Sequence, residues 1–177
     1  MKLGAAFLLA IAIFGASVQP RVSRTSIQQM EQSVDGKVLA IDQNEPGYLL
    51  GPTRGVYLDG YGVVFTAEVD LLPSAAPNPF RPAYSKQDIL RLKAKKQTRI
   101  SLLKQKMRDT IIAAAGPLDN LAPDDRIALA VTIPYYSWED GTGLPRQIVM
   151  YAPRSLLVKG AKGDTLAVDN GLKVQEF

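Results

Sequence analysis

Apolar and polar residues alternate most regularly between residues 63 and 72, which predicts a strand with one buried and one wet face. Glu68 and Asp70 fall on the wet face of this strand. The apolar run Val56–Leu58 precedes it, separated by the turn sequence Asp59-Gly60-Tyr61-Gly62. Two such runs around an Asp-Gly turn are typical of a β-hairpin.

A different period begins after Ser85 and predicts one long helix over residues 86–115. Ser85 is placed to cap the first turn, with Asp88 at the capping-box position three residues later. Gly116-Pro117 is a strong stop signal. The apolar stripe of this helix consists of Ile89, Leu92, Ile100, Leu103, Met107, Ile111 and Ala114.

Alternation returns in residues 127–136 and 146–152, on either side of the loop Ser137–Pro145. We therefore expect an α+β fold of two layers. An antiparallel sheet built from residues 56–72, 127–136 and 146–152 would carry the helix of about 86–115 across one face.

Signals are weaker elsewhere. Residues 18–36 are expected to form a flexible or short helical lead-in to a single domain over residues 37–177, with a strand at Lys37–Ile41 after the turn Asp35-Gly36. Four prolines in residues 73–82 predict an extended loop. Near the C-terminus we expect a short helix or turn at Pro153–Lys162 and an edge strand at Leu172–Val174.

The N-terminal segment has the layout of a secretory signal peptide. Lys2 is followed by 16 uncharged residues from Leu3 to Val18, with small residues where a signal peptidase cleaves. A membrane anchor needs about 20 apolar residues, so cleavage after Ala16 or Ser17 is favoured over an uncleaved inner-membrane anchor formed by residues 3–18. We expect residues 1–17 to be removed and the product to be periplasmic or secreted.

Charge is concentrated in the long helix. The chain has a net charge of +4, but residues 86–109 hold nine Lys and Arg and two acids, a local excess of +7. Lys95, Arg99 and Lys106 lie on one flank of the apolar stripe. Such a flank suits an anionic envelope component or contact with a membrane surface; alternatively, it is the solvated side of a helix packed on the sheet. Nucleic acid is not expected as the partner of an exported protein.

The residue inventory excludes several chemistries. The chain has no His and no Cys, so it cannot build a Ser-His-Asp triad, a thiol nucleophile or the usual zinc sites. No phosphate-binding loop motif is present, and no cofactor or metal is expected. Glu68 with Asp70, or Glu139 with Asp140, could serve a hydrolase as paired carboxylates, although solvated strand and turn residues are the commoner explanation.

Aromatic residues Tyr135, Tyr136 and Trp138 gather at the loop after the third strand. Tyr136 and Trp138 are candidates for contact with a sugar or a partner, unless they close a small core of the loop itself. The sequence thus favours a non-enzymatic module that binds or assembles with an unknown protein or anionic component of the envelope. The alternative is a carboxylate-dependent hydrolase acting on cell-wall glycan.

Overall fold

The computed structural model describes residues 22–42, 45–73, 77–78, 80 and 83–177. The predicted signal segment, residues 1–17, lies outside them, as does part of the proline-rich loop. No helix of the described ranges is long and apolar enough to span a membrane. The elements are α1 (Arg24–Leu39), β1 (Tyr48–Leu49), β2 (Arg54–Leu58), β3 (Gly62–Asp70), α2 (Lys86–Ala114), β4 (Arg126–Thr132), β5 (Gln147–Pro153), α3 (Arg154–Ala161), α4 (Thr165–Gly171) and β6 (Lys173–Glu176).

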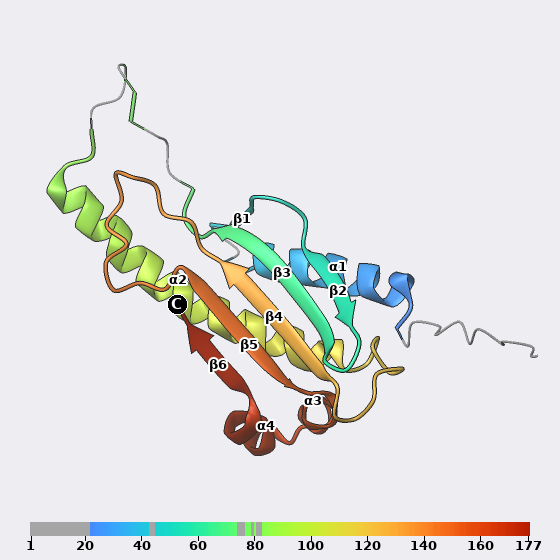
Figure 1. The fold of residues 1–177 in the computed structure, drawn as a ribbon. Coiled ribbons are helices and arrows are strands. Elements are labelled where there is room, and N and C mark those ends of the chain that lie inside the picture. The colour runs from blue at the N-terminus through green and yellow to red at the C-terminus, as the bar shows by residue number, and fades with distance from the viewer. Residues whose placement is uncertain (1–21, 43–44, 74–76, 79, 81–82) are drawn as a thin grey trace, which may run out of the picture.

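These elements confirm the α+β class, with the strands joined in one open sheet (Figure 1). The sheet runs β1-β3-β4-β5-β6, and β2 also pairs with β3 on its outer side. The hairpins β2–β3 and β4–β5 are antiparallel, as expected. The pair β3–β4 is parallel, so the sheet is mixed and not antiparallel throughout. The reason is the connection: α2 carries the chain back along the sheet, as a crossover between parallel strands must.

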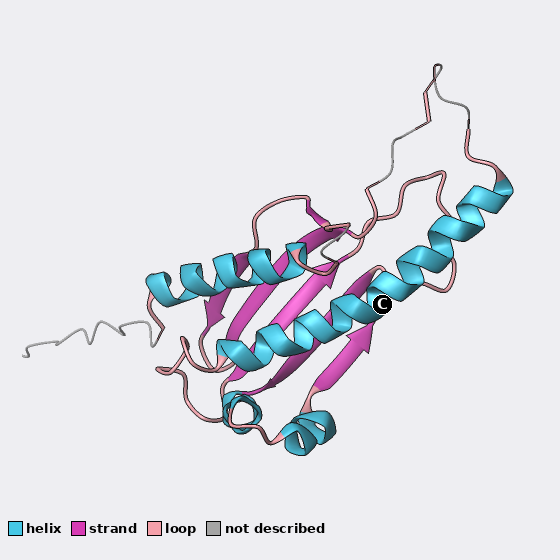
Figure 2. Ribbon diagram, turned by 180° about the vertical axis from the view of Figure 1, so that it is seen from behind, coloured by secondary structure: helices cyan, strands magenta, loops and turns pink. Residues whose placement is uncertain are grey.

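α1 and α2 both lie on one face of the sheet, and no helix among the described residues covers the other face (Figures 1 and 2). α2 has the expected capping box between Ser85 and Asp88 and ends one residue before the predicted limit. Its apolar stripe faces the sheet, with Leu103 and Met107 fully buried. The two helices and the covered face of the sheet thus enclose one core.

α1 corrects the expected strand at Lys37–Ile41. The helix begins at the cap Ser23 and continues without a break through Asp35-Gly36 to Leu39. Its inward side chains recur at helical spacing and are all buried; they are Ile27, Met30, Val34 and Val38. Burial of this stripe against the sheet outweighs the low helix propensity of Gly36.

The C-terminal elements extend the sequence expectation. α3 occupies the stretch predicted as a short helix or turn, and α4 follows it through Gly163, whose φ of 98° suits glycine. β6 pairs antiparallel with β5. It begins one residue later than the edge strand predicted at Leu172–Val174 and is one residue longer. It forms the outer edge of the sheet on this side.

Candidate functional site

The basic charge of α2 is mostly bound within the chain. Seven of its nine Lys and Arg side chains form ion pairs with carboxylates. One pair lies within the helix, and the others reach segments far away in the sequence. The seven pairs are Arg91–Asp88, Lys93–Asp140, Lys95–Glu45, Lys96–Glu139, Arg99–Glu45, Lys104–Glu176 and Arg108–Asp169.

Two of the three helix residues predicted to bind a ligand hold the same internal partner. Lys95 Nζ lies 2.5 Å from Glu45, and Arg99 Nη1 lies 3.3 Å from it. Arg99 also donates to the backbone oxygen of Glu45, and its side chain is only 3% exposed. The expected exposure of Arg99 is therefore wrong. Lys106 is half-buried and forms no ion pair with the described residues.

Glu139 and Asp140 fix the loop between β4 and β5 onto α2. Lys96 Nζ lies 2.6 Å from Glu139 Oε2, and the two side chains are 3% and 4% exposed. Lys96 also lies 5.0 Å from the ring centre of Tyr135. Beside this buried pair, Lys93 donates to Asp140 at 2.8 Å. That hydrogen bond is the main cause that lowers the pKa of Asp140 to about 2.

The aromatic residues of this loop form a stack. Trp138 lies between Tyr84 and Tyr136, with ring centroids 4.6 and 5.6 Å away. Tyr136 donates its hydroxyl to Asp70 Oδ2 at 3.2 Å, and the charge of Asp70 raises the pKa of Tyr136. The two predicted binding residues Tyr136 and Trp138 therefore lie together, apart from Lys106, and are joined to β3 through Asp70.

The carboxylates considered for hydrolysis have mostly structural partners. Asp70 is 3% exposed, so its expected position on a wet face is wrong. It accepts from the Leu72 backbone at 3.0 Å as well as from Tyr136. Glu139 is buried in its pair with Lys96. Glu68 is exposed on the side of β3 that faces away from the helices. Among the described residues, no cluster of three or more acids could hold a metal ion.

The uncovered face of the sheet offers a second surface, which we call the open face. Residues directly opposite one another in the register share a face. One row consists of Val56, Val64, Ala128, Tyr151 and Lys173, and the adjoining row of Arg54, Thr66, Ala130, Val149 and Gln175. The centre of the open face is thus apolar and made of small or β-branched residues.

Cations flank this apolar centre. Arg54, Arg126 and Lys173 are exposed, and none forms an ion pair with a described residue. The Arg126 guanidinium lies 5.5 and 5.8 Å from the ring centres of Tyr61 and Tyr151, which orient it. Sequence analysis missed these cations because they come from three strands that only the register brings together.

Exposed apolar groups and a hollow complete the open face. Val56 and Leu58 are 49% and 45% exposed on β2. A hollow of about 260 Å³ lies at the other end, lined by Gly51, Pro52, Arg54, Thr66, Ala67, Glu68 and Thr132. The open face therefore combines unpaired positive charge with accessible apolar surface.

Comparison with known proteins finds no family model that matches the chain, no curated protein that matches its sequence and no solved structure that matches its fold.

Proposed function

We propose that this chain is an exported, non-enzymatic binding module of the cell envelope, and that the open face binds an anionic, partly apolar ligand. The observation that carries the proposal is the contrast between two sets of cations. Seven of nine on α2 are neutralised by the chain's own acids, whereas Arg54, Arg126 and Lys173 have no carboxylate partner among the described residues.

The composition of the open face defines the ligand class. Val56 and Leu58 supply apolar contact, and Arg54 and Arg126 supply positive charge on the same face. A ligand that carries a phosphate group beside acyl chains, such as an anionic phospholipid, matches both features. The hydrolase alternative has less support because Asp70 and Glu139 are buried in contacts with other residues.

The test uses protein purified from the periplasm of an expressing host, and its mass should show that residues 1–17 have been removed. Sedimentation with phosphatidylglycerol vesicles should show binding that weakens as salt rises, with phosphatidylcholine vesicles as the uncharged reference. One cation near an anionic surface contributes about 1 kcal/mol. The double variant Arg54→Gln/Arg126→Gln should therefore bind about 30-fold more weakly.

A matched control removes the same charge elsewhere. Lys86 and Lys159 are exposed on α2 and α3 and form no ion pair with described residues. Lys86→Gln/Lys159→Gln should bind within about twofold of the unaltered protein if the open face is the surface used. Equal losses in the two double variants, or no binding by the unaltered protein, would overturn the proposed ligand surface. Intact Met1 in the membrane fraction would overturn export with cleavage.

A further inference from the structure

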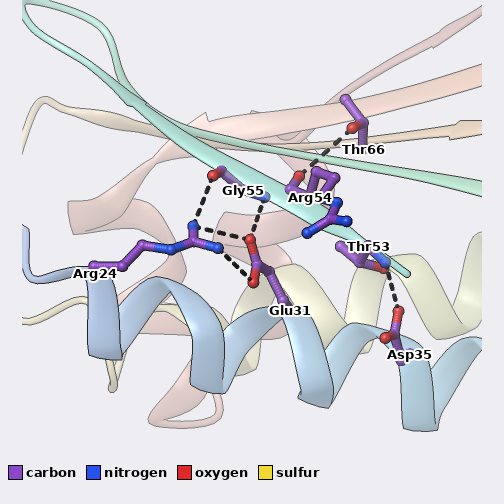
Figure 3. A network of polar contacts seen from close by, with 7 residues as sticks. All are labelled: Arg24, Glu31, Asp35, Thr53, Arg54, Gly55 and Thr66. Atoms are coloured by element: carbon purple, nitrogen blue, oxygen red, sulfur yellow. Dashed lines mark hydrogen bonds and ion pairs between the residues drawn. The ribbon is translucent and has the colours of Figure 1, made fainter. Parts of the chain in front are cut away.

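The two edges of the sheet differ in how their backbone groups are satisfied. At β2, side chains of α1 form hydrogen bonds with backbone N–H and C=O groups that point away from β3 (Figure 3). Glu31 accepts from the Gly55 N–H at 2.8 Å, and Arg24 donates to the Gly55 carbonyl at 3.2 Å. Asp35 accepts from the Thr53 N–H at 3.0 Å. These contacts take the groups that an incoming strand would need, so this part of the β2 edge is closed to strand pairing.

The β6 edge has no such protection among the described residues. Phe177 and Gln147 exchange both backbone hydrogen bonds, at 3.0 and 3.2 Å. Because hydrogen-bonded pairs alternate along an antiparallel ladder, Val174 and Glu176 direct their N–H and C=O groups outward. No hydrogen bond to these outward groups occurs within the described chain. All four residues of β6 are exposed.

A groove runs beside this edge, between β6 and α2. Its volume is about 280 Å³, and Met150, Leu172 and Val174 line it together with Lys104 and Arg108. The two cations are already paired, with Glu176 and Asp169 respectively. The charge of the groove is therefore balanced, and its free surface is apolar, with Val174 45% exposed.

We propose that β6 binds an extended segment of a partner protein by strand addition. In this arrangement the backbone of the segment pairs with Val174 and Glu176, and one of its apolar side chains enters the groove. The next residue of the segment faces Lys173 on the opposite side of the sheet, because side chains alternate along a strand. Lys173 is exposed and unpaired within the described chain, so an acidic residue is favoured there.

A second copy of this chain fits the edge less well. Antiparallel self-pairing centred on Val174 places Lys173 opposite Gln175, which leaves the Lys173 charge unmatched. Self-pairing centred on Gln175 places Glu176 opposite Val174, a carboxylate against the apolar groove. By contrast, a segment in which an apolar residue is followed by an acidic one places the apolar side chain in the groove and the carboxylate beside Lys173.

The probe is the capped peptide Thr-Thr-Thr-Leu-Asp-Val-Thr, and a scrambled peptide that separates Leu from Asp is the reference. Titration followed by amide NMR should show shifts at Val174 and Glu176 and slower exchange of their amide protons. The scrambled peptide should bind at least tenfold more weakly. No binding, or shifts confined to other parts of the chain, would overturn the proposal. It would also be overturned if the free protein were a dimer in which the amides of Val174 and Glu176 are already protected from exchange. That result would identify a second copy of the chain as the occupant of the edge.

Two variants separate edge pairing from general damage. Val174→Pro removes an outward N–H and leaves the ladder to β5 intact, so it should abolish peptide binding. Val174→Thr retains the N–H and should bind within about threefold of the unaltered protein. If Val174→Pro does not fold, Lys173→Glu provides the same test by charge. It should weaken binding at least tenfold, and a peptide with Lys in place of Asp should restore it; failure of this rescue would contradict the assigned register. Val174→Pro and Val174→Thr leave Arg54, Arg126 and Lys173 unchanged, so their comparison is independent of ligand binding by the open face.

Discussion

The buried pair between Lys96 and Glu139 allows a quantitative test of how α2 uses its charge. Both side chains are almost fully buried, and Glu139 also accepts from the Tyr136 backbone at 3.1 Å. Glu139→Leu would leave the Lys96 ammonium buried without a carboxylate. Removing one partner of a buried pair costs about 3–5 kcal/mol, so we expect a loss of that size in the free energy of unfolding.

Replacing both partners should have a different result. Glu139 Oε1 is buried and has no hydrogen-bond partner in the described chain, so the pair does not fully compensate its desolvation. Lys96→Met/Glu139→Leu removes both charges at similar volume. Such replacements range from neutral to stabilising by about 1–4 kcal/mol. The double variant should therefore be more stable than Glu139→Leu, because both lack the bond to Tyr136, which contributes about 1.5–3 kcal/mol as a bond to a charged group, and only Glu139→Leu leaves an unpaired buried charge.

Urea unfolding of Lys96→Met, Glu139→Leu and the double variant gives the coupling energy directly. The neighbouring pair Lys93–Asp140 serves as a control, because its side chains are 26% and 35% exposed. Asp140→Leu should cost much less than Glu139→Leu, because solvent screens a partly exposed pair. If Glu139→Leu costs no more than Asp140→Leu, the buried ammonium is not penalised as argued and the reasoning fails.

Three further predictions concern stability. Leu103→Ala should cost about 2–5 kcal/mol in thermal or urea unfolding because the side chain is fully buried; an unchanged melting temperature would show that the stripe does not pack on the sheet. Gly55→Ala should cost about 1–3 kcal/mol, since its Cβ would lie 2.6 and 2.7 Å from buried side-chain atoms of Ile27 and Phe65. Gly36→Ala, in an open helical position, should instead raise stability by about 0.5–1 kcal/mol. Equal effects of the two substitutions would refute the close approach of α1 to Gly55. The Asp140 pKa is lowered to about 2, so its bond with Lys93 stabilises the fold fully above its ordinary pKa of 3.8 and is lost as the pH falls through about 2. The stability difference between the unaltered protein and Asp140→Asn should shrink over that range, and a constant difference would contradict the assignment.

Local sequence signals predicted the elements that local physics determines. The capping box at Ser85 and the helical stripe located α2 nearly to the residue, and the Asp-Gly turn located the β2–β3 hairpin. α1 was underestimated because the exposed glutamines between the residues of its stripe make the segment polar and because Gly36 resembles a turn. Its helical state depends on burial against the sheet, which no local pattern reports.

Long-range pairing explains what the sequence could not provide. Arg99 and Glu45 are 54 residues apart, and Lys96 and Glu139 are 43 apart. A helical wheel places Arg99 on a basic flank, but only the fold brings Glu45 over it. The parallel pairing of β3 with β4 has the same origin, because it depends on the path of α2 over the sheet. The open face depends in turn on that register.

The charge balance also changes once these pairs are known. Residues 86–109 carry an excess of +7 in the sequence, but five acids from outside this segment form ion pairs with it. Counted with those acids, α2 retains only +2, and the rest of the chain, without them, carries the other +2 of the net +4. A basic run along one helix therefore does not identify a ligand surface by itself, since a folded chain can neutralise it with its own carboxylates. Cations that keep no such partner are the better guide, and three of them, Arg54, Arg126 and Lys173, lie on strands of the open face.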